Sequence, residues 1–207
     1  MSQQRQHPRL RLDFYQTAVL LSRRGEDGQI LTHPVSVHDV VGACADLSLG
    51  SGLLPANTLF WGQQASQVAM GIYVPARRWR MRTEEYVYHV PMPPFVFIGK
   101  GSGYRIFAVK QRPVGEEEPL YHAPCPNVHP DGGICQGNTP FPVCSSQTIE
   151  AALSLFMENS LFNGDLSRGK NRGYPDDVRQ LWAVLEGKKR FLLSELVSCG
   201  RLLRDLL

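Results

Sequence analysis

The stretch from Tyr121 to Gly137, YHAPCPNVHPDGGICQG, most constrains what this chain can fold into. Its prolines and glycines exclude a helix interior, because proline removes a backbone donor and glycine weakens helices. They also exclude an inner strand over the whole stretch. Asp131-Gly132-Gly133 has the composition of a sharp turn that leads into Ile134 and Cys135. We therefore predict a long ordered loop, and such loops in compact domains are usually functional.

The bulk composition limits the class of protein and of partner. The chain has 207 residues and a formal net charge of +3, which suits one domain of generous size. This charge is too small to require a nucleic acid or a membrane as partner. The arginines from Arg77 to Arg82 alternate with Trp79 and Met81, as in a strand with one solvated face, and so favour nucleic-acid binding only weakly. No apolar run approaches the ~18 residues that span a bilayer.

The cysteine count indicates a reducing compartment. The five cysteines are an odd number, and no two are spaced as CxxC. In a chain of this length, that pattern favours reduced thiols over a disulfide framework. The N-terminus carries no apolar segment of signal-peptide length. We therefore expect a cytoplasmic protein.

Apolar runs and turn signals predict β structure before the loop. Runs at residues 14–22 and 29–32 predict an opening hairpin, which His33-Pro34 ends. Ser36 can cap a helix that reaches about Leu47. After a breaker-rich linker at 49–55, an antiparallel meander is predicted, with strands at residues 67–74, 79–89, 95–99 and 104–109.

Apolar residues at helical spacing follow the loop. One helix begins at Ser145 or Ser146 and carries an apolar stripe from Ile149 to Leu161. The polar segment 165–174 is expected to be exposed. Two more helices are predicted, one after Pro175 and one at 191–197.

Strands followed by helices predict an α+β fold, in which the helices pack on one face of an antiparallel β-meander and the long loop follows the sheet. The expected boundaries are a flexible N-terminus at residues 1–11, a core at 12–164, and a C-terminal helical extension of the same domain at 165–207.

The chemistry of the loop centres on Cys135 and Asn127. An exposed thiol is a few per cent thiolate at neutral pH, which is enough to attack a thioester. Such attack places negative charge on the former carbonyl oxygen, and a fixed side-chain amide can stabilise that charge. Asn127, on a proline-stiffened loop, is well suited to this role. We therefore interpret Cys135 as a nucleophile and Asn127 as its supporting donor.

The loop resembles that of ubiquitin-conjugating enzymes. These carry a His-Pro-Asn tripeptide, one apolar residue, a five-residue turn, and then an apolar residue before the catalytic cysteine. Here Pro126-Asn127-Val128 precedes the turn at residues 129–133 and Ile134-Cys135, without a gap. The chain is also similar to the PRTRC system protein B family, a bacterial relative found in plasmid-type gene cassettes, through the segment from Pro119 to Gly137.

The resemblance implies a conjugating enzyme with the fold of that family. Cys135 would carry a ubiquitin-like protein as a thioester and pass it to an amine, with Asn127 as the second catalytic residue. No cofactor and no metal would be needed. The implied partners are a ThiF-like activating enzyme, the ubiquitin-like protein and a JAB-type peptidase of the same system. One departure is Cys125, which stands where these enzymes have a structural His, and His122 or His129 could compensate for it.

Other interpretations of these residues remain open. Cys135 could be a buried apolar filler, and Asn127 a simple turn residue. The protein could be a non-catalytic adaptor that keeps the fold and binds the ubiquitin-like protein or the activating enzyme. Cysteines and histidines of the loop could instead ligate zinc in a nucleic-acid-binding protein, although short paired spacings are lacking.

Overall fold

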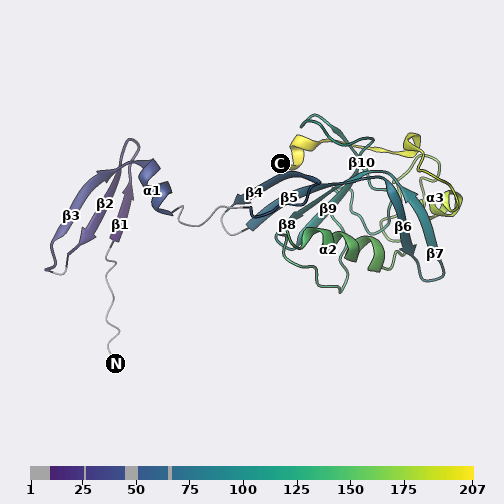
Figure 1. Ribbon diagram of the computed structural model, residues 1–207, viewed down its shortest axis with the longest axis horizontal. Helices are drawn as coiled ribbons and strands as arrows, with labels where there is room; N and C mark the ends of the chain where they lie inside the picture. The colour runs from purple at the N-terminus through teal and green to yellow at the C-terminus, as the bar shows by residue number, and fades with distance from the viewer. Residues whose placement is uncertain (1–9, 26, 45–50, 65–66) are drawn as a thin grey trace, which may run out of the picture. The chain divides into compact units, whose positions relative to one another are not determined.

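The computed structural model describes residues 10–25, 27–44, 51–64 and 67–207 (Figure 1). The chain divides into two compact units, Met1–Gly50 and Ser51–Leu207. The boundary lies at the predicted linker, so the expected core at 12–164 does not begin where we placed it. Residues 165–207 share a unit with residues 51–164.

The first unit is a small antiparallel sheet followed by a helix. Its elements are β1 (Leu10–Phe14), β2 (Val19–Arg24), β3 (Ile30–Val35) and α1 (Val37–Cys44). The capping role of Ser36 is confirmed, because its Oγ accepts from Asp39 N–H while the Asp39 carboxylate accepts from Ser36 N–H. This reciprocal pair is a capping box.

The predicted opening hairpin is correct in part. The predicted strand at residues 14–22 is interrupted by a turn, which is closed by a hydrogen bond from Tyr15 N–H to Ala18 O. Leu10 and Arg11 pair with β2, so the flexible N-terminus does not extend to residue 11; residues 1–9 lie outside the described part. Pro34 does not end β3, because β3 is an edge strand and tolerates a missing donor.

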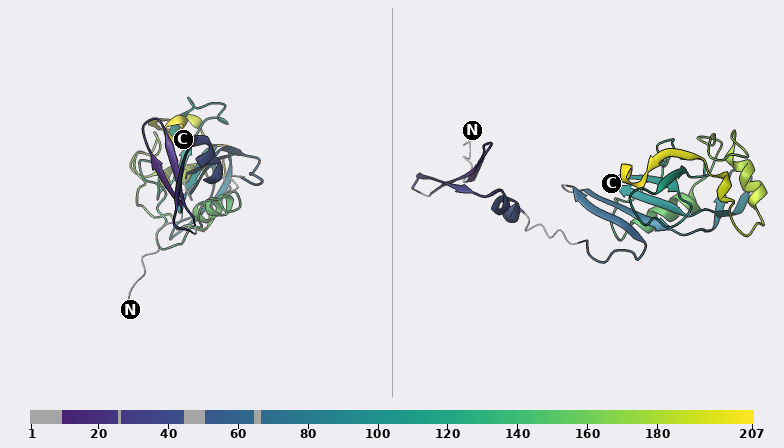
Figure 2. Two further views of the ribbon diagram at one scale, coloured as in Figure 1. Left: turned by 90° about the vertical axis from the view of Figure 1, so that its left-hand side faces the viewer. Right: turned by 90° about the horizontal axis from the view of Figure 1, so that it is seen from above.

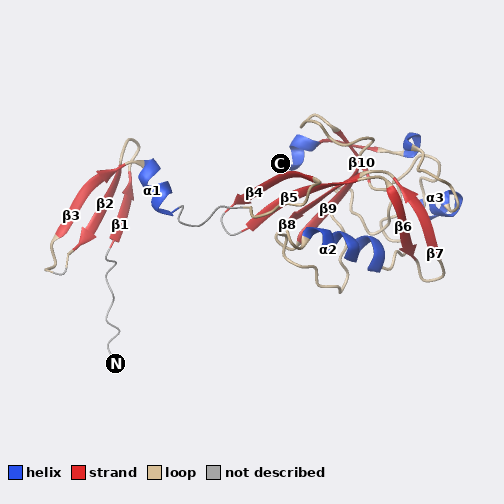
Figure 3. Ribbon diagram, viewed as in Figure 1, coloured by secondary structure: helices blue, strands red, loops and turns tan. Residues whose placement is uncertain are grey.

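The second unit is built on a sheet that we call the large sheet. Its order among the described residues is β11-β10-β9-β8-β5-β4, and every pairing is antiparallel (Figure 3). These strands are β4 (Thr58–Gln64), β5 (Gln67–Val74), β8 (Phe95–Lys100), β9 (Gly103–Ala108), β10 (Pro119–His122) and β11 (Ser198–Leu202). The predictions for β5, β8 and β9 are confirmed, whereas β4, β10 and β11 were missed.

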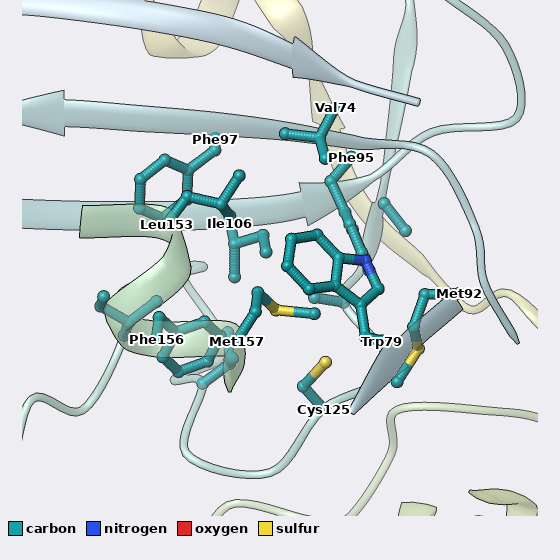
Figure 4. Packing of buried hydrophobic residues seen from close by; sticks show 14 of the residues in the cluster. Val74, Trp79, Met92, Phe95, Phe97, Ile106, Cys125, Leu153, Phe156 and Met157 are labelled. Carbon is teal, nitrogen blue, oxygen red and sulfur yellow. The ribbon is translucent and has the colours of Figure 1, made fainter. Parts of the chain in front are cut away.

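The large sheet is covered on both faces. On β8, Phe95 and Phe97 enter one apolar cluster, whereas Val96 and Ile98 enter another. The first cluster includes residues of α2 (Ile149–Ser154) and α3 (Val178–Leu185), and Figure 4 shows its packing around Trp79. The second includes Leu203 of the 3₁₀ turn η3 (Leu203–Leu206). Figures 1 and 2 place α2 and η3 on opposite sides of the sheet. The two α-helices of the second unit, α2 and α3, therefore contribute to the cluster on one face, as expected, while η3 helps to cover the other face.

The predicted strand 79–89 is wrong. The structure forms a hairpin there, with β6 (Arg77–Arg82) and β7 (Val87–Met92) paired outside the large sheet. The turn is closed by Thr83 N–H to Tyr86 O at 2.8 Å and by Tyr86 N–H to Thr83 Oγ1 at 3.0 Å. A threonine hydroxyl makes this turn, so the usual glycine and proline signals are absent.

The C-terminal third also departs from the predicted helices. The first α-helix ends at Ser154, and a π-helical turn, η1 (Leu155–Asn159), follows it. Leu161 lies beyond both elements and is exposed. The predicted helix at 191–197 is only the 3₁₀ turn η2 (Leu193–Glu195). The segment 165–174 is not simply exposed, because its residues Ser167, Lys170 and Asn171 are buried.

The packing of Phe97 predicts how much free energy of unfolding is lost when its side chain is truncated. Phe97 is fully buried and stacks on Tyr104 at a centroid distance of 5.3 Å. We expect Phe97→Ala to lower the free energy of unfolding by about 3–5 kcal/mol, through lost burial and a residual cavity. Denaturant unfolding measures this change. Leu53→Ala is the control: Leu53 is 96% exposed, so its loss should stay within about 0.5 kcal/mol. Equal effects of the two changes would contradict the packing described here.

Candidate active site

The residues from Asn127 to Cys135 form a tight hairpin, which we call the cysteine hairpin. Val128 and Ile134 make an antiparallel bridge, and His129 N–H donates to Gly133 O at 2.7 Å. Gly132 N–H donates to His129 O, and Gly132 has a φ of 85°. This is a three-residue loop closed by a left-handed glycine. The predicted sharp turn at Asp131-Gly132-Gly133 is therefore confirmed.

The hairpin brings together the two residues that the spacing selected. Cys135 N–H donates to Asn127 O at 2.7 Å, so the two residues lie opposite each other across the hairpin. The Cys135 side chain is exposed, which excludes the interpretation of a buried filler.

One arm of the hairpin is attached to the large sheet. Ile134 N–H donates to Tyr104 O at 3.0 Å, and Ile106 N–H donates to Gly132 O at 2.9 Å. Both acceptor and donor lie on β9, which is an inner strand between β8 and β10. Cys135 therefore follows directly on a segment held by the most regular part of the fold.

Asp131 stabilises the turn. Its carboxylate accepts from Gly133 N–H at 3.1 Å and lies 3.6 Å from the Arg105 guanidinium. The hydrogen bond from Gly133 is the main reason that the pKa of Asp131 lies below its usual value; burial opposes it, and the charge of Arg105 adds a smaller lowering effect. The carboxylate is half-exposed, so its ion pair contributes little by itself.

Asn127 is fixed by a segment far along the chain. Its backbone is left-handed, with a φ of 59°, a conformation that costs free energy for a residue other than glycine. Its Nδ2 donates to Leu161 O at 2.9 Å, and its backbone N–H donates to Asp165 O at 3.1 Å. The interpretation as a turn residue with only a local side-chain bond is therefore wrong. An amide NH₂ has two N–H donors, and among the described residues only Leu161 accepts one of them.

Cys125 belongs to the core. It is fully buried in the cluster of Figure 4, and burial raises the pKa of its thiol to about 12. The neighbouring Pro124 carbonyl accepts from the indole Nε1 of buried Trp182 at 2.9 Å. Cys125 is thus a small apolar residue beneath the hairpin.

Neither histidine near the loop takes over the orientation of Asn127. His129 is exposed at the turn, and the Asn127 amide is held by Leu161 instead. Burial, followed by the charge of Lys170, lowers the pKa of the half-buried His122. His122 therefore favours its neutral form.

Sequence reasoning missed Lys170. Its side chain is buried, and its Nζ donates to Val128 O at 2.7 Å. Burial lowers the pKa of Lys170, while Cys125 and Asp131 act in the opposite direction. Its neighbours along the chain are Gly169 and Asn171 in a polar segment, and nothing in that pattern distinguishes it from a solvated lysine.

Two broader properties bear on the kind of site. Within the described ranges, no three His, Cys, Asp or Glu side chains gather closely enough to hold a metal ion, so the zinc alternative finds no ligand set there. In the same part of the chain, no helix has the length and apolar character needed to cross a membrane.

A mixed α/β architecture with antiparallel sheets and few helices fits an E2-like fold. The chain belongs to prokaryotic E2 family D, whose model matches residues 38–199. The match covers α1 and most of the second unit, including the cysteine hairpin. It places the chain in a bacterial group related to ubiquitin-like conjugation, whose members generally work with an activating enzyme and a ubiquitin-like protein. Neither the curated proteins nor the solved structures gave a match.

Gly132 offers a test of the hairpin. A Cβ at this position would lie 2.2 Å from Cζ of Phe107, and the φ of 85° disfavours any other residue. We expect Gly132→Ala to lower the free energy of unfolding by about 1–3 kcal/mol, through overpacking and backbone strain. Denaturant unfolding measures this loss. A matched control is Gly115→Ala, because a Cβ at Gly115 meets nothing within 4 Å. A stable Gly132→Ala protein would contradict the close approach of the turn to β9.

Proposed function

We propose that this protein is a conjugating enzyme that carries a ubiquitin-like protein as a thioester on Cys135 and transfers it to an amine. The observation that carries this proposal is the pairing of exposed Cys135 with Asn127 through the 2.7 Å backbone hydrogen bond. Membership in an E2 family supports the same class of reaction.

The reaction has two acyl-transfer steps. In the first, the Cys135 thiolate attacks the activated C-terminal carbonyl of the modifier, a carbon–sulfur bond forms, and the activating group leaves. In the second, an amine attacks the thioester carbonyl, the carbon–nitrogen bond forms, the amine loses a proton, and the Cys135 thiolate leaves. The second N–H of Asn127 is the donor that stabilises the oxyanion of this step.

The proposal includes the partners expected from the resemblance. The donor is a ThiF-like activating enzyme, and the cargo is a ubiquitin-like protein. A JAB-type peptidase of the same plasmid-type PRTRC system would process or remove the modifier. The acceptor is an amine, which gives up a proton as the neutral amide forms.

A second candidate function is a non-catalytic adaptor for the modifier or the activating enzyme. The observation that favours it is the bond from Asn127 Nδ2 to Leu161 O, which occupies one donor of the amide. An adaptor would bind its partners without forming a covalent adduct.

A loading assay separates these functions. The chain is mixed with its activating enzyme, the ubiquitin-like protein and ATP. We expect an adduct that thiols cleave, and Cys135→Ser should convert it to a slower-forming oxyester that resists thiols. Cys199→Ser is the matched control, because Cys199 is half-buried and donates to Leu120 O; it should load normally. Partner binding without any adduct would instead establish the adaptor.

Asn127→Gly tests the second residue without straining the backbone, because glycine readily adopts a φ near 59°. We expect loading to persist, while transfer from the thioester to free lysine slows by roughly 10²–10³-fold, the typical cost of losing one oxyanion donor. Single-turnover discharge measures the rate. Discharge at the wild-type rate would remove Asn127 from the chemistry and leave it a purely structural role.

A further inference from the structure

The segment from Leu161 to Lys170 holds one arm of the cysteine hairpin at three points. Leu161 O accepts from the Asn127 amide, Asp165 O accepts from the Asn127 backbone, and Lys170 Nζ donates to Val128 O. The first two contacts use backbone carbonyls, which any residue could supply. The third uses a side chain, so Lys170 is the contact whose residue identity matters.

The geometry of the hairpin explains why Val128 needs an external donor. In an antiparallel pair, alternate residues direct their N–H and C=O groups toward the partner strand. Here Asn127 C=O accepts from Cys135 N–H, and His129 N–H donates to Gly133 O. The carbonyl of Val128, which lies between them, therefore points away from the hairpin. Val128 is 1% exposed, so without a donor this carbonyl would be a buried, unpaired acceptor.

Lys170 satisfies this acceptor from a buried position. The residue is 3% exposed, and its hydrogen bond to Val128 O measures 2.7 Å, the length of a charge-assisted bond. A lysine is rarely buried so completely, because desolvation of its amine is costly. The groups that act on its charge are Cys125, Asp131 and His122. Lys170 is therefore a buried lysine whose amine donates to the backbone carbonyl of the residue next to Asn127.

We propose that Lys170 is a positioning residue for acyl transfer: by holding the Val128 carbonyl, it keeps Asn127 aligned with the thioester on Cys135. This inference rests on the proposed conjugating function. Lys170 touches neither the modifier nor the reacting atoms, and it acts through Val128 and Asn127. Loading needs only an exposed sulfur, whereas transfer needs the amide of Asn127 at the right place. Loss of Lys170 should therefore slow the second step more than the first.

The test uses Lys170→Met in the full chain, because methionine keeps the length of the stem and removes the donor. We expect discharge of the thioester to free lysine to slow about tenfold, since small misplacements of a reacting group cost up to about 10²-fold. Loading should stay within about twofold of wild type. The control is Lys189→Met, at an exposed lysine, which should leave both rates unchanged. Equal slowing of both steps would reduce Lys170 to a general folding role and overturn the proposal.

Two measurements test whether Lys170 holds the cysteine hairpin, and neither of them requires an activity assay. In Lys170→Met, hydrogen exchange at the Cys135 amide should accelerate about tenfold or more, while the amide of Phe97 in β8 stays protected. In the wild-type protein, the amide shifts of Asn127 and Cys135 should follow the titration of the Lys170 amine, which is read from the resonances of the Lys170 side chain itself. This second experiment needs no variant to fold.

These outcomes separate the two proposals. If wild type forms no thioester, the conjugating function fails, and Lys170 is then judged on exchange and titration alone. If thioester forms but the Asn127 and Cys135 amides respond neither to Lys170→Met nor to the Lys170 titration, the positioning role is overturned while the enzyme stands.

Discussion

The hydrogen bond from Cys135 N–H to Asn127 O is the interaction on which the candidate site depends. It exists because residues 127–135 close into a hairpin that only a left-handed glycine at position 132 allows. The second arm of that hairpin is bonded to β9, so the sulfur is carried by the sheet and not by a free loop. The exposed thiol of Cys135 is therefore carried on a fixed backbone.

The first arm of the hairpin is fixed by a different part of the fold. Asn127 has a left-handed backbone, which is uncommon for residues other than glycine, and residues 161–170 hold it there. Beneath this arm, Cys125 packs into the core and Trp182 bonds the carbonyl of Pro124. The C-terminal segment, which resembles an appendage in the sequence, therefore shapes the site as much as the sheet does.

The polar groups under the hairpin show how strained backbone is tolerated in a protein interior. Two backbone groups that point away from the hairpin find partners in residues 161–170: Asn127 N–H donates to Asp165 O, and Val128 O accepts from Lys170 Nζ. Buried backbone groups left unpaired would destabilise the fold by about 1–3 kcal/mol each. The strain at Asn127 is thus sustained by surrounding contacts, which is the usual condition for strained residues at functional sites.

Much of this protein could be predicted from local pattern. The runs at 67–74, 95–99 and 104–109 became β5, β8 and β9, because alternation and continuous apolar character are properties of neighbouring residues. The spacing from Asn127 to Cys135 likewise indicated one loop with two facing groups. The turn at Thr83–Tyr86 was missed, since a threonine hydroxyl replaced the usual glycine.

Sequence alone determined which residues form the loop, and that one cysteine and one side-chain amide lie on it. Only the tertiary structure decided what holds them, because Leu161, Asp165 and Lys170 lie more than thirty residues along the chain from the residues that they contact, and they carry no motif. A buried lysine and a solvated lysine cannot be distinguished in a sequence. Lys170 differs because folding buries its amine next to the Val128 carbonyl, to which it donates a hydrogen bond.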